Sequence, residues 1–138
     1  MEKGHNMNWS MWSIDRILIL FVSLAFLVLG IQVTLFHYRQ NFNHKSMWVP
    51  VLSAPIFFIT GIVLTWYNAS WLHTLFMVLM WLGVIDGLIG FYFHFRGVGI
   101  RVGGWALRNF LIGPPIALPL MFSALSVLGL IAIYWEAR

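Results

Sequence analysis

Residues 72–96 have the sequence LHTLFMVLMWLGVIDGLIGFYFHFR, and the stretch from Leu72 to Phe93 holds a single charged residue, Asp86. This stretch is longer than the roughly 20 apolar residues that a helix needs to cross a bilayer. Three other stretches are equally apolar. The sequence therefore predicts four transmembrane helices, over residues 17–36, 48–67, 72–93 and 115–135.

The composition supports a membrane protein. Hydrophobic residues make up 61% of the 138 residues and charged residues 9%, which lies outside the range of soluble globular domains. The connections between the apolar stretches are too short for a second folded domain, so we predict a single all-α domain over residues 1–138. The net charge of +4 comes from Lys and Arg residues that flank the apolar stretches, which indicates contact with lipid headgroups and not with nucleic acid.

A four-residue phrase occurs twice in the chain. Phe36-His37-Tyr38-Arg39 ends the first predicted span, and Phe93-His94-Phe95-Arg96 ends the third. Each phrase is followed by a basic loop, a tryptophan and two prolines five residues apart. The pattern predicts two tandem, related helical hairpins, whose first helices run in the same direction across the membrane.

The longest predicted loop covers residues 94–113. We expect its first part to be flexible or tightly turned because of four glycines: Gly97, Gly99, Gly103 and Gly104. Residues 105–112 are predicted to form a short interfacial helix before the last span.

Lys and Arg residues are unevenly distributed between the two sides of the predicted bundle. The side with the two repeated phrases has Arg39, Lys45, Arg96, Arg101 and Arg108, and the side with both termini has Lys3, Arg16 and Arg138. This excess predicts cytoplasmic loops and extracytoplasmic termini.

His37 and His94 form the first candidate site. They end parallel helices at the same predicted depth, and a haem b iron can be held by two imidazoles from opposing helices. Arg39 and Arg96 follow at the headgroup level, where arginine pairs well with the carboxylates of haem propionates, and Arg101 or Arg108 could serve in the same way. The alternative is that these side chains only anchor the helix ends in the interface.

Asp86 is the second candidate site, because it is the only acidic residue well inside a predicted span. A carboxyl group in the bilayer is costly, and it marks a proton relay, an ion site or a polar contact for a ligand such as a quinone. Gln32 on the first helix has nearly the same depth, and we expect it to be the hydrogen-bonding partner. The alternative is a protonated, purely structural Asp86 bonded to a neighbouring helix.

Two segments resemble those of a loose group of small bacterial four-helix membrane proteins with no assigned activity. They are Gly90-Phe-Tyr-Phe-His94 and the stretch GPPIALPLMF over residues 113–122, and the resemblance extends to His37, Asn41, Phe42, Trp48 and Pro50. It implies four helices and the bacterial inner membrane, and it implies no activity.

Three functions are compatible with the sequence. We favour a non-enzymatic subunit or accessory protein of a larger bacterial membrane complex, with a membrane-protein partner or a second copy of the chain. The second hypothesis is a redox subunit that holds haem b between His37 and His94 and exchanges electrons with a quinone near Asp86. The third is a small transporter or proton-conducting unit that uses Asp86.

Overall fold

The computed structural model describes residues 8–136, apart from the Glu136 side chain, and is all-helical over this range. Lys3 and Arg138, which entered the sequence analysis, lie outside the described residues. The elements in chain order are α1 (Ile14–Arg39), the short 3-10 helix η1 (Lys45–Met47), α2 (Trp48–Trp66), α3 (Ser70–Arg101), α4 (Leu107–Ile112) and α5 (Ala117–Glu136).

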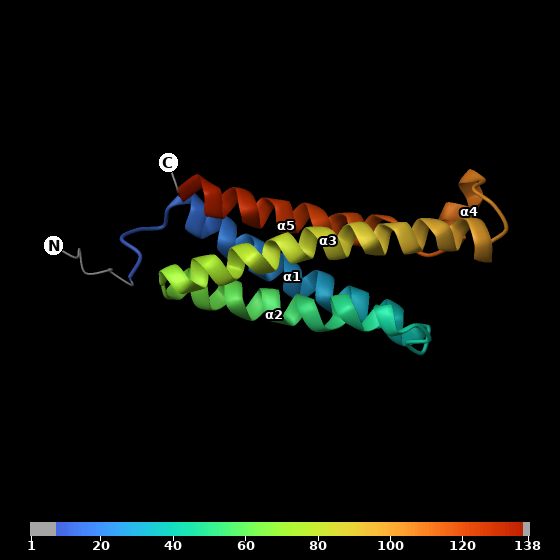
Figure 1. Cartoon of the computed structure of the whole chain (residues 1–138), viewed down its shortest axis with the longest axis horizontal. Helices are drawn as coiled ribbons and strands as arrows, with labels where there is room; N and C mark the ends of the chain where they lie inside the picture. Colours follow the sequence, from blue (N-terminus) through green and yellow to red (C-terminus); the bar gives the residue numbers. More distant parts are fainter. Residues whose placement is uncertain (1–7, 137–138) are drawn as a thin grey trace.

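Four of the helices, α1, α2, α3 and α5, are long and apolar enough to cross a membrane, which confirms the predicted four-helix transmembrane bundle. They form a ring in which α1 packs against α2 and α5, and α3 also packs against α2 and α5. Helices α1 and α3 are therefore diagonal neighbours that run in the same direction (Figure 1). We call the end of the bundle with the connection around Lys45 and with α4 the loop end, and the opposite end the terminal end.

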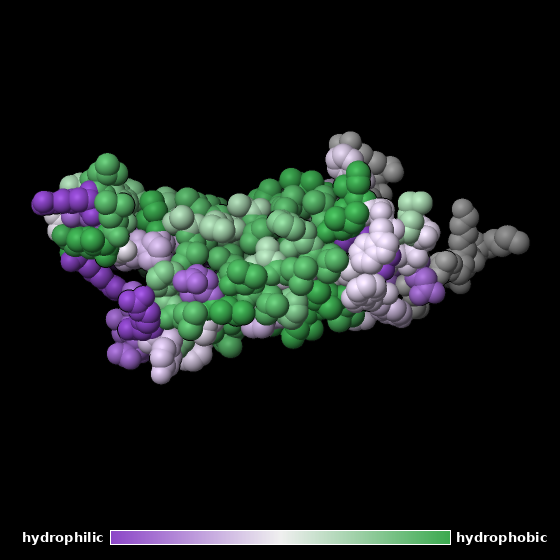
Figure 2. Space-filling model, turned by 180° about the vertical axis from the view of Figure 1, so that it is seen from behind, coloured by the Kyte–Doolittle hydropathy of each residue, from purple (hydrophilic) through white to green (hydrophobic). Residues whose placement is uncertain are grey.

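The surface and the interior of this bundle are both apolar. Large hydrophobic side chains are exposed along all four long helices, and Figure 2 shows them as a continuous belt between two more polar ends. In water such a surface would drive aggregation, whereas in a bilayer it faces acyl chains. The surface therefore supports a multi-pass membrane protein.

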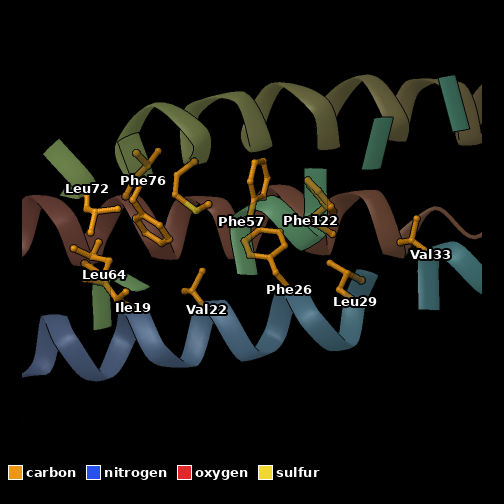
Figure 3. Close-up of a cluster of buried hydrophobic side chains, with 14 of the residues drawn as sticks. Ile19, Val22, Phe26, Leu29, Val33, Phe57, Leu64, Leu72, Phe76 and Phe122 are labelled. Carbon is orange, nitrogen blue, oxygen red and sulfur yellow. The ribbon is translucent and has the colours of Figure 1, made fainter. Parts of the chain in front are cut away.

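Aromatic rings fill the centre of the bundle (Figure 3). Phe26 of α1 contacts Phe57 of α2 and Phe122 of α5, with ring centroids 5.1 Å apart in both pairs. All three side chains are at most 2% exposed. This cluster holds three helices together at mid-depth.

Small residues let the helices approach closely within each hairpin. A Cβ atom added to Gly30 of α1 would lie 2.8 Å from Cβ of Ala54 in α2, and one added to Gly87 of α3 would lie 2.6 Å from the Ser123 backbone nitrogen in α5. Close backbone approach through small residues is the usual way in which helices associate in lipid. The two glycines are equivalent in the predicted repeat, and each faces the second helix of its own hairpin.

Helix α3 is longer than predicted, and this corrects the prediction of a loop beginning at residue 94. It continues to Arg101 because Gly97 and Gly99 are used for packing: a Cβ atom at Gly97 would contact Pro114, and one at Gly99 would overlap the Trp105 ring. The turn comes only at Gly103 and Gly104, whose φ angles are +91° and +129°. The predicted short helix before the last span is confirmed as α4.

At the terminal end, Arg16 of α1 is enclosed by tryptophans. Its guanidinium carbon lies 3.7 Å from the centre of the Trp12 ring and 5.4 Å from that of Trp66. Its Nε donates a hydrogen bond to the Thr65 carbonyl oxygen at 2.9 Å. These contacts fasten the segment before α1 to the end of α2.

Candidate functional site

His37 and His94 meet inside the loop end of the bundle. They come from α1 and α3, the two diagonal helices, and their ring centroids are 6.5 Å apart with the ring planes at 75°. The equal depth of the two histidines along their helices does not by itself decide whether their rings face the bundle interior or the lipid. The packing of α1 and α3 on their neighbours turns both rings inward.

The imidazole of His94 is held by a backbone carbonyl. Its Nδ1 lies 2.6 Å from the Pro115 carbonyl oxygen, just before α5. A carbonyl oxygen only accepts hydrogen bonds, so Nδ1 must donate the proton, and the lone pair of the neutral ring lies on Nε2. Histidines that bind metals are oriented by such a bond from their other nitrogen.

The imidazole of His37 has an unused polar atom. The side chain is 9% exposed, and its Nδ1 is buried with no hydrogen-bond partner. The backbone of Met47, just before α2, lies beside the ring. Each histidine thus lies next to backbone that precedes the second helix of its hairpin. A buried polar atom without a partner is costly, and it often indicates a ligand.

The two imidazoles line a cavity of about 460 Å³. All four long helices contribute to its wall, and the loop end is divided into two lobes in the space-filling view (Figure 2). Phe122 lies at the deep, apolar end, the histidines follow, and Arg96 and Arg101 lie on the wall nearest the loop end. The cavity is therefore cationic near the loop end and, apart from Asp86, mostly apolar at its deep end.

The arginines differ from the prediction in one respect. Arg96 lines the cavity as expected, but Arg39 is exposed and is not part of the wall. Arg101 takes its place on the wall. The sequence placed Arg101 in a loop, whereas the extension of α3 brings it over the cavity.

Asp86 lies on the deep part of the same wall. Its Oδ2 accepts a hydrogen bond from Ser53 Oγ of α2, at 3.4 Å. The predicted partner was wrong, because Gln32 is exposed on the outer face of α1. Gln32 follows the inward-facing Gly30 by two residues, about 200° around the helix, and so points away from the bundle.

The donor set limits which metals could be held. Within residues 8–136, no three or more His, Cys, Asp or Glu side chains are grouped so as to bind a metal ion. Two imidazoles are enough to hold a metal ion only where its other ligands are supplied by a group such as a porphyrin. The site therefore suits a haem better than a free metal ion.

The repeated phrase identified both histidines. It did not identify two hydrogen-bonding partners in the site, the Pro115 carbonyl oxygen and the Ser53 hydroxyl group. The Pro115 carbonyl has no sequence signal, since a backbone oxygen is present at every residue. Ser53 is a common type of residue in transmembrane helices, and only the pairing of α2 with α3 shows its role.

No known protein family, curated protein or solved structure shows significant similarity to this chain.

Proposed function

We propose that this protein is a haem b-binding electron-transfer subunit of a membrane complex, with His37 and His94 as the axial ligands. The convergence of the two imidazoles on the bundle axis supports this proposal most directly. Arginines at the mouth of the cavity and apolar side chains at its deep end agree with it.

The separation of the rings suits coordination of one iron. An imidazole nitrogen binds a first-row metal at about 2 Å and the ring centre lies about 1 Å farther, so two axial rings have centres about 6 Å apart. The measured separation is 6.5 Å. The separation of the ring centres therefore agrees with that needed to hold one iron between the two imidazoles.

The polarity of the cavity also matches that of haem b. The macrocycle and its vinyl groups are apolar and fit the end near Phe122, whereas the two propionates are anionic. Arg96 and Arg101 line the opposite end, where a guanidinium group can form paired hydrogen bonds with a carboxylate. Arg96 and Arg101 would thus hold the propionates at the loop end.

A haem alone transfers electrons and catalyses nothing further in this setting. The described part of the chain offers no second redox group, so a donor and an acceptor must come from the membrane or from another protein. This agrees with our expectation of an accessory subunit in a larger complex. The bacterial inner membrane with cytoplasmic loops remains the proposed location, based on the charge distribution.

The test is the absorption spectrum of the purified protein, produced in haem-replete cells and solubilised in detergent. We expect a reducible Soret band, which should be lost in His37→Ala and His94→Ala and retained in the control His73→Ala. His73 is on α3 as well, 21 residues before His94 and so about 30 Å away. Added imidazole should restore the spectrum of His94→Gly, which separates loss of a ligand from loss of the fold.

Two results would contradict the proposal. The wild-type protein could be folded and colourless, or its bound haem could be insensitive to both substitutions. Colourless protein that conducts protons through liposomes, with a flux abolished in Asp86→Asn, would instead support the transport hypothesis.

A further inference from the structure

The proposed haem site leaves unused the hydrogen-bonded pair formed by Asp86 of α3 and Ser53 of α2. We propose that this pair binds a membrane quinol at the seam between α2 and α3, and that Asp86 accepts a proton when the quinol passes an electron to the haem. The inference rests on the proposed function and names the electron donor.

The pair lies deeper in the bundle than the two histidines. Asp86 precedes His94 by eight residues and is therefore about 12 Å deeper along α3. It lies on the wall of the same cavity. A ligand at Asp86 would thus approach the apolar edge of the macrocycle, far from the arginines that suit the propionates.

The outer side of the seam faces lipid. Of the four neighbouring pairs of long helices, α2 and α3 pack least extensively. The aliphatic side chains on both sides of the seam are at least half exposed: Leu52, Ile56, Ile85 and Ile89. A lipid-soluble molecule can therefore reach the outer side of the seam from the bilayer without crossing the aqueous phase.

The Asp86 and Ser53 side chains at the seam favour a ligand that is neutral and donates a hydrogen bond. Ser53 Oγ lies 2.8 Å from the Val49 carbonyl oxygen and 3.4 Å from Asp86 Oδ2, and one hydroxyl proton serves both acceptors. The carboxylate of Asp86 thus keeps unused acceptor capacity. A phospholipid phosphate would be repelled by this carboxylate, whereas a quinol hydroxyl donates to it.

The proposed step balances as follows. A quinol loses one proton to the Asp86 carboxylate and one electron to the ferric haem, which gives a neutral semiquinone, a protonated Asp86 and a ferrous haem. Two semiquinones then disproportionate to one quinone and one quinol. The net reaction oxidises one quinol for every two haems reduced, and it releases two protons once both Asp86 groups deprotonate.

The experiment uses the full-length, haem-loaded protein in detergent without oxygen. Decylubiquinol is mixed with the ferric protein, and the reduction of the haem is followed by its absorbance. We expect Asp86→Asn to slow the reduction on the order of 100-fold, the usual effect of losing a general base. Asp86→Glu should recover part of the rate, and Ser53→Ala should change it less than Asp86→Asn does.

Two controls separate a local effect from a general one. Gln32→Leu replaces another polar side chain in a long helix, one that faces outward on α1, and it should leave the rate unchanged. Dithionite should reduce the haem fully in every variant, with the same haem content and spectrum as the wild type.

Each outcome decides between the two proposals. Haem-loaded protein that decylubiquinol does not reduce, or that it reduces equally fast in Asp86→Asn, overturns the quinol site and leaves the haem site standing. Protein without haem overturns both.

Discussion

Replacing Arg16 by glutamine should weaken the terminal end of the bundle. Arg16 is 9% exposed, and its guanidinium group lies over the Trp12 ring and donates a hydrogen bond to the Thr65 carbonyl oxygen. Glutamine is shorter and uncharged, so it would lose the stacking on Trp12 and would not reach the carbonyl in the same geometry. The segment before α1 would then lose one of its attachments to α2 and keep the hydrogen bond that Trp9 Nε1 donates to the Leu64 carbonyl oxygen.

The expected magnitude follows from these two interactions. A hydrogen bond from a charged group contributes about 1.5–3 kcal/mol, and a cation–π contact about 0.5–2 kcal/mol depending on its exposure. The two interactions share one side chain and are not strictly additive. We therefore expect Arg16→Gln to lower the free energy of unfolding by about 2–4 kcal/mol.

The measurement is reversible unfolding in mixed micelles with an increasing fraction of SDS, followed by the helical circular dichroism signal. Arg39→Gln is the matched control, since Arg39 is an exposed arginine at the other end of the same helix. It should change the free energy of unfolding by at most about 0.5 kcal/mol. Arg16→Lys should fall between the two, because lysine keeps the charge but loses the planar fork. Equal midpoints for Arg16→Gln and Arg39→Gln would refute the role given to the tryptophan enclosure.

Three further predictions concern the loop end. Gly87→Ala should lower the free energy of unfolding by about 1–3 kcal/mol in the same assay, because the added Cβ would lie 2.6 Å from backbone atoms of α5. An unchanged free energy of unfolding would contradict the close packing of α3 on α5. Arg101→Gln should release haem to apomyoglobin about tenfold faster, which corresponds to one lost charge-assisted bond of about 1.4 kcal/mol. Arg39→Gln should not change the release rate, since Arg101 lines the cavity and Arg39 does not. The chain has no cysteine, so the single-cysteine variants Leu111→Cys and Arg108→Cys can be compared in liposomes by their reaction with a hydrophilic maleimide. The Leu111 side chain is 82% exposed on α4. If it is inserted into lipid, the cysteine at position 111 should react more slowly than the one at position 108.

The number and depth of the helices could be predicted from the sequence because they depend on local properties. Each apolar stretch is long enough to span a bilayer, and the rise of 1.5 Å per residue fixes the depth of every side chain along its own helix. His37 and His94 could be placed at one level in this way. The end of α3 could not, since Gly97 and Gly99 are common in loops, and here their lack of a side chain makes room for Pro114 and Trp105.

The sequence by itself determined an all-helical membrane bundle, a cationic loop end and two histidines at equal height. Only the tertiary structure decided that both rings point inward, that Arg101 and not Arg39 lines the cavity, and that Asp86 pairs with Ser53 and not Gln32. The physical reason is that hydropathy reports depth but not the rotation of a helix about its axis in a bundle that is apolar both inside and outside. That rotation is set by close contacts between helices, such as Gly30 with Ala54 and Gly87 with Ser123, which exist only once the chain has folded.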